Sequence, residues 1–498
     1  MAEKLSEQEQ IRREKLEKYK ALGVDPFGQA FKRTHTNTEV IEKYGSFDKE
    51  TLAEKDINVT IVGRIMRKRL QGKVAFLTLQ DRDAQLQIYV RKDVIGDVSY
   101  EVFLLSDLGD IIGVEGTLFR TNMGELTVKV TKYTHLTKAL KPLPDKWSGL
   151  QDIEEIRRKR YIDLLMDEKS KNLALTRPKI IRSFQRFFDD RGFVEVETPI
   201  LQPILGGATA RPFITHHNTL DMNFNLRIAT ELPLKKLIVG GLEKVYEIGR
   251  LFRNEGMSPQ HNPEFTTVEA YEAYSDMEGM MNLVEDCISY VTFDILKTHD
   301  ITYQEKKISL KKPFKRITMT DAIKEQINVD FKEVSSLEEA KDIAKKHGVK
   351  VEKHFKIGHI IEEFFDKFVE KTIVQPTFVY HHPTDISPLA KKNKTDSRFA
   401  DRFELFIDGR EYANAFSELN DPIDQKERFE AQLKERELGN LEASEMDYDY
   451  IEALEHGLPP TGGLGIGIDR FVMLLLDVPN IRDIILFPHM KQKSHDWD

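Results

Sequence analysis

Residues 250–271 read RLFRNEGMSPQHNPEFTTVEAY, and this stretch says most about the fold. Two apolar runs flank a loop that holds Gly256, Pro259 and Pro263, so the segment predicts two strands joined by a loop. Charged and aromatic residues gather around that loop, which is an unusual use of charge for a purely structural hairpin. Arg253 could neutralise a phosphate, and an aromatic ring beside it could stack on a base. The stretch therefore predicts a binding loop.

A second informative stretch, residues 462–470, reads GGLGIGIDR and leads into the apolar helix expected over 471–476. Gly463, Gly465 and Gly467 alternate along a strand, so one face lacks side chains and a flat ligand can approach the backbone. The spacing is neither a dinucleotide-binding fingerprint nor a Walker loop. On this stretch alone, close packing explains the glycines equally well.

A third stretch precedes both of these and combines an amphipathic helix with a strand. The helix is expected to end at residues 191–193, and VEVETP at 194–199 follows as a strand. The apolar positions that share one helical face are Ile180, Ile181, Phe184, Phe187 and Phe188.

The pattern of apolar and charged residues along the chain changes several times and divides it into parts. Residues 1–55 predict a helical arm, and five short alternating runs within residues 56–140 predict a small closed β-barrel. The runs are 59–62, 74–79, 86–90, 111–114 and 126–130. A proline-containing linker is expected over 141–155. Residues 156–498 then form the larger domain, with a Lys- and Glu-rich helical insertion near 310–372.

Composition excludes several classes of protein. The 498 residues include a single cysteine, Cys287, so a disulfide framework and a cysteine zinc site are unavailable, and the thiol is expected to be a small buried side chain. No apolar run is long enough to cross a bilayer, so no membrane partner is expected. The charged N-terminus lacks the features of a signal peptide, which favours the cytoplasm. A net charge of −9 argues against a nucleic-acid-coated protein, although the basic run at 64–73 could still guide a phosphate backbone.

Taken in order, residues 192–199, 250–271 and 462–470 resemble motifs 1, 2 and 3 of the class II aminoacyl-tRNA synthetases. The barrel resembles the OB-fold anticodon-binding domain of the aspartate, asparagine and lysine branch, here of bacterial type. The resemblance implies an α+β fold in which an OB-fold β-barrel precedes a catalytic domain with an antiparallel sheet flanked by helices. It also implies a homodimer with motif 1 at the interface. The implied activity is ATP-dependent attachment of an amino acid to tRNA through an adenylate.

Activation sets a carboxylate against the α-phosphate of ATP, so positive charge and metal must offset the repulsion between two anions. The resemblance implies catalytic roles for Arg253 and Arg470, and Mg²⁺ bound by Glu404 and Glu411. A surface ion-pairing role remains the alternative for these two glutamates. The full set implied for ATP is Arg253, Glu255, His261, Phe265, Glu404, Glu411, Gly467 and Arg470.

Residues 411–421, EYANAFSELND, resemble the lysine branch of the family. Aspartate enzymes carry an arginine at the position of Glu418, whereas a buried carboxylate suits an ammonium group. The resemblance thus implies L-lysine and tRNA(Lys) as substrates and a lysyl-adenylate intermediate. An ordinary helix-surface glutamate remains the alternative for Glu418. The set implied for lysine is Gly207, Glu231, Arg253, Glu269, Tyr271, Asn414, Phe416, Glu418 and Gly465.

In the barrel, Phe76, Gln87 and Glu125 fall where this branch reads the central uridine of the anticodon. Stacking on a splayed base with hydrogen bonds to its edge is how single-stranded loops are recognised. Core packing remains the alternative for Phe76. Three rival functions stay open: an aspartyl- or asparaginyl-tRNA synthetase, a lysine ligase that modifies an elongation factor, and a regulatory or nucleic-acid-binding module. Glu418 argues against the first, the barrel against the second, and Arg253 and Arg470 against the third.

Overall fold

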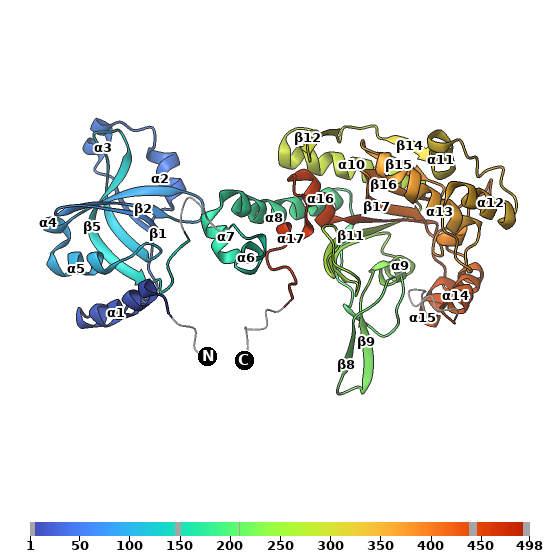
Figure 1. Cartoon of the computed structure of the whole chain (residues 1–498), viewed down its shortest axis with the longest axis horizontal. Coiled ribbons are helices and arrows are strands. Elements are labelled where there is room, and N and C mark those ends of the chain that lie inside the picture. The colour runs from blue at the N-terminus through green and yellow to red at the C-terminus, as the bar shows by residue number, and fades with distance from the viewer. Residues whose placement is uncertain (1–4, 145–150, 209, 438–445, 492–498) are drawn as a thin grey trace. The chain divides into compact units, whose positions relative to one another are not determined.

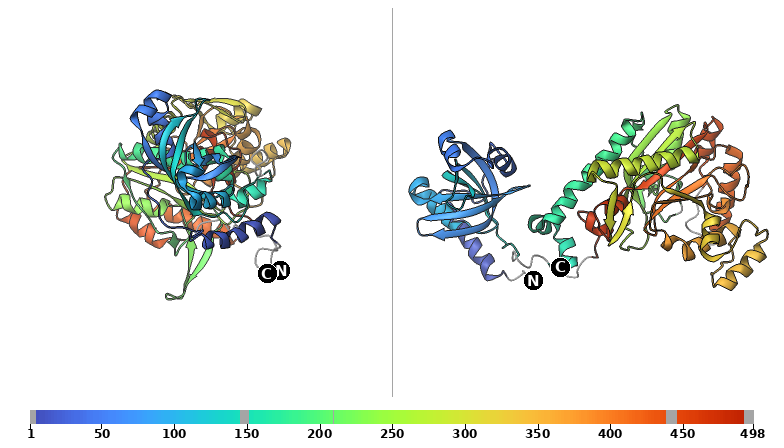
Figure 2. Two further views of the ribbon diagram at one scale, coloured as in Figure 1. Left: turned by 90° about the vertical axis from the view of Figure 1, so that its left-hand side faces the viewer. Right: turned by 90° about the horizontal axis from the view of Figure 1, so that it is seen from above.

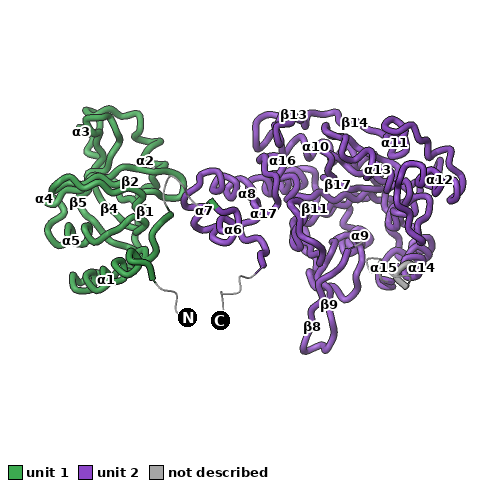
Figure 3. Tube along the Cα trace, in the orientation of Figure 1, with its two compact units in different colours: residues 1–151, 492–498 green, residues 152–491 purple. Residues whose placement is uncertain are grey.

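The computed structural model describes residues 5–144, 151–208, 210–437 and 446–491. The chain forms two compact units, one within residues 1–151 and the other of residues 152–491 (Figure 3). The boundary between them falls inside the stretch expected to be a linker. Residues 145–150 of that stretch lie outside the described residues.

The first unit contains the closed five-stranded barrel that the alternating runs predict (Figure 1). Its strands are β1 (Asn58–Gln71), β2 (Val74–Gln80), β3 (Gln85–Arg91), β4 (Ile111–Arg120) and β5 (Leu126–Thr137), in the order β1-β2-β3-β5-β4. Alternate side chains of each strand point inward, so Ala75, Leu77 and Leu79 are buried while Phe76 faces outward. The expectation of an OB-fold barrel is confirmed.

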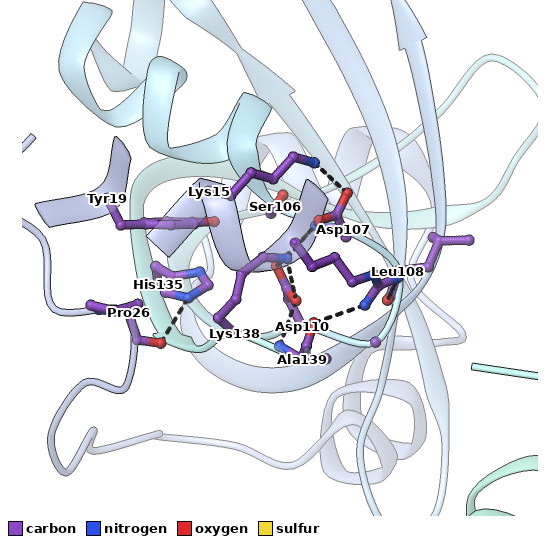
Figure 4. Close-up of polar contacts among 12 residues, drawn as sticks. Lys15, Tyr19, Pro26, Ser106, Asp107, Leu108, Asp110, His135, Lys138 and Ala139 are labelled. Carbon is purple, nitrogen blue, oxygen red and sulfur yellow. Dashed lines mark hydrogen bonds and ion pairs between the residues drawn. The ribbon is translucent and has the colours of Figure 1, made fainter. Parts of the chain in front are cut away.

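The N-terminal arm consists of three helices that share the barrel's core. They are α1 (Glu7–Ala21), α2 (Asn37–Tyr44) and α3 (Lys49–Lys55); α4 (Lys92–Ile95) and α5 (Asp97–Leu105) connect β3 to β4. Ion pairs link α1 to the loop between α5 and β4, and this loop to Lys138, which directly follows β5 (Figure 4). Lys15 Nζ lies 2.6 Å from Asp107 Oδ1, and the fully buried Lys138 lies 2.6 Å from Asp107 and 2.9 Å from Asp110. A buried ammonium requires such partners, because an unpaired one would pay its full desolvation cost.

The second unit is built on an eight-stranded sheet in the order β14-β15-β16-β17-β18-β11-β10-β6 (Figure 1). Its strands are β6 (Val194–Glu195), β10 (Lys244–Phe252), β11 (Glu264–Ala273), β14 (Lys315–Thr318), β15 (Thr377–Tyr380), β16 (Arg402–Ile407), β17 (Arg410–Ser417) and β18 (Thr461–Gly467). The central pairings are antiparallel, as expected, but β14 with β15 and β6 with β10 are parallel. Parallel neighbours need a long crossover, and intervening helices supply one in each case.

Three helices pack on one face of this sheet: α8 (Glu168–Asp189), α10 (Met277–Leu296) and α16 (Ile468–Leu475). α8 and α10 also pack against each other (Figure 2). Phe184, Phe187 and Phe188 lie on the apolar face of α8 that the periodicity predicts, but all three are fully buried in the unit's own core. That face is therefore not a free interface surface, and the expectation that it contributes to the interface of the implied homodimer is wrong. Cys287 lies in the same core, as expected.

The predicted strand over 194–199 is shorter than expected. Only Val194 and Glu195 pair with β10, and the chain turns away before Pro199, which has no N–H to continue a ladder. The short β7 (Leu201–Gln202) and the hairpin of β8 (Ile214–His217) and β9 (Met222–Leu226) form a separate small sheet.

The helices expected near 310–372 are present. The strand β14, which precedes them, belongs to the main sheet. The helices are α11 (Met319–Ile327), α12 (Leu337–His347) and α13 (Ile357–Phe368), packed in a core of their own.

On the other face of the main sheet lie α9 (Glu231–Val239), α14 (Pro422–Glu437) and α15 (Tyr448–Glu455). The remaining elements are α6 (Ile153–Arg158), α7 (Arg160–Met166), β12 (Asp300–Tyr303), β13 (Lys306–Ser309), η1 (Glu370–Thr372), η2 (Thr384–Ile386) and α17 (Ile481–Ile484). Within the described residues, no helix is long and apolar enough to cross a membrane.

Candidate active site

Strand alternation creates a polar pocket on the face of the sheet opposite α8 and α10. Even-numbered residues of β11 and β18, odd-numbered residues of β16, and Ala413 and Ala415 of β17 enter the core, so the residues between them face the pocket. A shift in the pairing of β16 with β17 changes the alternation at the start of β17, where Glu411 faces the pocket. The pocket has a volume of about 490 Å³, within the usual range for a small-molecule site. It is lined by every residue that the sequence assigns to ATP or lysine: Gly207, Glu231, Arg253, Glu255, His261, Phe265, Glu269, Tyr271, Glu404, Glu411, Asn414, Phe416, Glu418, Gly465, Gly467 and Arg470.

One end of the pocket carries cations beside an aromatic ring. Arg253 follows β10, and its guanidinium carbon lies 5.2 Å from the centroid of the Phe265 ring on β11. Its backbone N–H donates to the Pro263 carbonyl at 2.8 Å, which closes the loop between the two strands. The Arg253 Nε–H is buried and has no hydrogen-bond partner among the described residues. A buried, unused donor on a guanidinium suits an anionic ligand.

Arg470 and His261 form the other side of this end. Arg470 Nη1 donates to the Glu411 carbonyl at 2.8 Å, and Arg470 Nη2 lies 3.2 Å from His261 Nε2. His261 Nδ1 lies 2.8 Å from the Ser258 hydroxyl. Partial burial and the charge of Arg470 lower the pKa of His261, so the ring is neutral at pH 7 and Nε2 accepts from Arg470.

Glu404 and Glu411 lie on the neighbouring strands β16 and β17 and both face the pocket. Arg402 Nη2 donates to Glu404 Oε1 at 2.6 Å, and Arg470 Nη1 lies 3.3 Å from Glu411 Oε2. The two carboxylates are thus ion-paired, but within the pocket rather than on an outer surface. The described residues contain no group of three or more His, Cys, Asp or Glu side chains that could hold a metal by themselves.

The other end of the pocket is acidic and buried. Glu231, Glu269 and Glu418 all lie at its wall, and Glu418 is 1% exposed. It follows β17 and belongs to no helix, so the alternative of a helix-surface glutamate is wrong. The Thr230 N–H and the Tyr271 hydroxyl donate to the two oxygens of Glu269, at 3.2 and 3.3 Å. Burial and the negative charge of Glu231 raise the pKa of Glu269 to about 7.

Two glycines make room for this end. A Cβ atom on Gly463 would lie 2.0 Å from Glu418 Oε1 and 2.5 Å from the Tyr271 ring, so no larger residue fits there. Gly207 has a φ of +87°, which favours glycine, and a Cβ atom there would lie 3.0 Å from the Ala229 Cβ. Close packing therefore explains Gly463, whereas Gly465 and Gly467 line the pocket and a Cβ atom there would meet no atom closer than 3.7 Å.

Sequence reasoning missed three residues that organise the pocket. Lys235 on α9 pairs with Glu231 and Glu418, and Arg402 pairs with Glu404. Asp469 accepts from the Thr266 N–H at 2.7 Å and pairs with an arginine of α8, which ties α16 to β11. The spacing of Glu231 and Lys235, four residues apart on a helix, was the one available signal.

The three barrel residues lie on one outer face of the first unit. Phe76 on β2 is half-buried, and its ring lies 4.9 Å from the Tyr89 ring, which in turn contacts Phe119 at 5.8 Å. Gln87 Nε2 donates to a threonine hydroxyl at 2.9 Å, and Glu125 is exposed. Because Phe76 lies outside the barrel core, the core-packing alternative is wrong. Tyr89 and Phe119 extend the aromatic surface beyond what the sequence indicated.

Comparison with known proteins gives the same division of the chain. Residues 152–491 match the family model described as tRNA synthetases class II (D, K and N), and residues 59–136 match an OB-fold nucleic acid binding domain. The chain is 59% identical over 492 residues to the lysine--tRNA ligase of Bacillus cytotoxicus, covering 99% of both chains. It is 58% identical over 491 residues to that of Bacillus subtilis, covering 99% of this chain and 98% of the other. It is 59% identical over 492 residues to that of Listeria monocytogenes, covering 99% of both chains.

Proposed function

Because the chain belongs to the class II tRNA synthetases of the D, K and N group, we propose that ATP binds at the Arg253 end of the pocket and L-lysine at the Glu418 end. The chain catalyses the ATP-dependent attachment of lysine to tRNA(Lys) through a lysyl-adenylate. A lysine carboxylate oxygen attacks the α-phosphorus of ATP, and the bond to pyrophosphate breaks. A hydroxyl of the tRNA then attacks the lysyl carbonyl and AMP leaves.

The cationic end suits the first step. The reacting carboxylate and α-phosphate are both anions, so their approach needs a preorganised positive charge. Arg253 offers a buried N–H without a partner, and it stands beside the Phe265 ring, which would stack on adenine. Arg470 is positioned by Glu411 and His261 to contact the polyphosphate. Glu255, Asn414, Phe416, Gly465 and Gly467 complete the contacts that we propose for ATP and lysine.

The acidic end carries the choice of lysine. Three buried carboxylates, Glu231, Glu269 and Glu418, line this end, and one internal ammonium, Lys235, pairs with two of them, Glu231 and Glu418, so this end has an excess of carboxylates. Lysine brings two ammonium groups, one on the α-carbon and one on the side chain. An aspartate side chain would add a further negative charge to this end, and an asparagine side chain would bring no ammonium to it.

ATP–pyrophosphate exchange with a panel of amino acids tests this function without tRNA. We expect exchange with L-lysine and none comparable with aspartate, asparagine or arginine. Exchange driven best by aspartate or asparagine would overturn the assignment of the acidic end.

We propose that Glu404 and Glu411 hold Mg²⁺ together with ATP oxygens. Two hard carboxylates on neighbouring strands at the pocket wall fit this ion, which is usually bound by one or two carboxylates plus substrate phosphates. When bound, the ion would neutralise phosphate charge. Arg402 orients Glu404, and Arg470 orients Glu411.

The acidic end predicts a pH dependence for lysine. Since the pKa of Glu269 is about 7, this carboxyl takes up a proton below neutral pH and can no longer pair with an ammonium. We expect kcat/KM for lysine to fall about tenfold per pH unit well below pH 7 and to level off above it. Glu269→Gln should remove the part of this acid limb that Glu269 contributes and leave the part that comes from Glu418, whose pKa is also raised. A wild-type profile that stays flat between about pH 6 and 8 would contradict the prediction.

We propose that Phe76, Gln87 and Glu125 read the anticodon, with Tyr89 and Phe119 extending the stacking surface. Phe76→Ala should weaken tRNA recognition by about 1–3 kcal/mol, the scale of one base–aromatic stack, and leave lysine exchange without tRNA unchanged. Aminoacylation kinetics with varied tRNA measure the effect. Val74→Ala, on the same strand, is a control for local packing. A folded Phe76→Ala protein with a wild-type KM for tRNA would exclude Phe76 from the anticodon site.

We propose that the chain forms a homodimer through exposed apolar side chains at and near β6, and not through the buried face of α8. Val194, at the edge of the main sheet, and Ile200, Leu201 and Ile214, near it in sequence, are exposed apolar side chains. Exposed apolar residues at a strand edge are typical of an interface. We expect sedimentation velocity to show a dimer at micromolar concentration, and Ile214→Asp to weaken it. A wild-type monomer under these conditions would exclude the dimer.

Two further assignments follow from this function. We propose the cytoplasm, where tRNA, ATP and lysine meet. We also propose residues 1–55 as the arm, 56–140 as the anticodon-binding domain, 141–155 as the linker, and 156–498 as the catalytic domain with an insertion near 310–372. The elements of the two compact units support this division.

A further inference from the structure

A lysine of the chain itself lies directly behind the acidic end of the pocket. Lys235 is 0% exposed, and its Nζ lies 2.7 Å from Glu231 Oε1 and 2.7 Å from Glu418 Oε2. Both carboxylates line the pocket, whereas Lys235 does not. Glu231 and Lys235 are four residues apart on α9, which places them on the same face of that helix. The ammonium therefore contacts the carboxylates from the side away from the ligand.

The two oxygens of Glu418 have different surroundings. Oε2 accepts from Lys235, but Oε1 is buried and has no partner among the described residues. Oε1 stands over Gly463 on β18, because a Cβ atom at that glycine would lie 2.0 Å from it. One oxygen is thus held by an internal cation, while the other is left for something in the pocket. A buried carboxylate oxygen without a partner needs such an explanation.

The charges around Glu418 show what Lys235 does. Burial and the carboxylate of Glu231 raise the pKa of Glu418, and Lys235 opposes both effects. Burial alone would lower the pKa of Lys235, but Glu231 and Glu418 hold it well above its usual value. The titratable groups that face this pair are Glu231 on α9, Glu269 and Tyr271 on β11, and Tyr450 on α15. Without the ammonium, the pKa of Glu418 would rise further.

We propose that Lys235 is a positioning residue for substrate selection: it pairs with Glu418 and Glu231 and orients them so that Glu418 Oε1 receives the side-chain ammonium of lysine. This proposal rests on the lysine pocket proposed above. Lys235 touches no substrate and acts through Glu418. The same carboxylate then bridges an internal ammonium and the ligand's ammonium, one on each oxygen.

Lys235→Met tests the proposal, because methionine keeps much of the length of the side chain and removes the charge. We expect KM for lysine in ATP–pyrophosphate exchange to rise about 10- to 100-fold, the scale of a hydrogen bond to a charged group. KM for ATP should stay within about twofold. The midpoint of the acid limb for lysine should move to higher pH, since Glu418 now holds its proton more tightly. A merely structural role would not move that midpoint.

Lys236→Met is the matched control. Lys236 is the next residue of α9 and pairs with Asp449, an exposed side chain, so its loss should leave lysine kinetics and the pH profile unchanged. Because Lys235→Met leaves buried carboxylates without their cation and could fail to fold, the Glu418→Gln/Lys235→Met double variant provides a second test. Removing both partners leaves less uncompensated charge. If Lys235 acts through Glu418, Lys235→Met should raise KM for lysine much less in the Glu418→Gln background than in the wild type. If the single Lys235→Met variant cannot be measured, the double variant should have a KM for lysine within about twofold of that of Glu418→Gln.

The outcomes separate the two proposals. A folded Lys235→Met protein with wild-type lysine KM and pH profile, or a double variant whose losses multiply, would overturn the role of Lys235. Equal losses for lysine and ATP would overturn it as well. If Glu418→Gln itself leaves lysine kinetics unchanged, the pocket assignment fails first. If Glu418→Gln is impaired but Lys235→Met is not, only the present inference fails.

Discussion

Replacing Arg253 by methionine is expected to lower lysine-dependent ATP–pyrophosphate exchange by about 10²–10³-fold, mainly in kcat. The reason is that Arg253 supplies positive charge where two anions must meet, and a preorganised donor at such a point contributes on this scale. Its buried Nε–H has no partner among the described residues, so removing this donor breaks no internal hydrogen bond. Methionine retains part of the packing against Phe265. The fold should therefore survive.

Arg250→Met is the matched control for this variant. Arg250 lies on the same strand, β10, but its half-exposed side chain pairs with Glu264 outside the pocket. Surface pairs of this kind contribute little, so exchange should stay near the wild-type rate. Circular dichroism checks that both variants are folded. If Arg253→Met retained more than about a tenth of the wild-type rate, Arg253 would not be the residue that brings the two anions together.

The sequence was sufficient to predict the strand–loop–strand of residues 250–271. Its apolar flanks predict two strands, and the glycine, prolines and charged residues between them predict a binding loop. It was also sufficient for the glycine strand β18 and the helix after it. Both predictions rest on local patterns, namely alternation along a strand and apolar periodicity along a helix. The pocket follows from them, since alternate residues of adjacent strands share a face.

What the sequence could not provide is the set of partners brought together from distant segments. The pairs of Arg402 with Glu404 and of Asp469 with an α8 arginine depend on the sheet and its packing, not on local spacing. The apolar face of α8 shows a related limit. Periodicity identifies a buried face but does not say whether the chain's own core or another subunit covers it, and here it is the chain's own core.

Glu418→Gln is expected to have the largest effect on the choice of substrate, because it removes a buried charge while keeping the shape of the side chain. Losing one partner of a buried ion pair costs about 3–5 kcal/mol, which corresponds to roughly 10²–10³-fold or more in lysine affinity. In this pocket Glu418→Gln weakens two interactions, the pairing of Oε2 with Lys235 and the proposed contact of Oε1 with the ligand. KM for ATP should change little, because the ATP contacts lie at the Arg253 end.

Norleucine, the neutral isostere of lysine, makes this prediction specific. With the wild-type protein, we expect strong discrimination against norleucine, since its methyl group would leave Glu418 Oε1 buried and unpaired. With Glu418→Gln that penalty shrinks, so the ratio of kcat/KM for lysine to that for norleucine should fall by one to two orders of magnitude, on the order of 1.4–3 kcal/mol. Glu272→Gln is a control, because Glu272 pairs with Lys244 away from the pocket. Unchanged discrimination in a folded Glu418→Gln protein would show that the side-chain ammonium of lysine is recognised elsewhere, with Glu231 and Glu269 as the remaining buried carboxylates that could receive it.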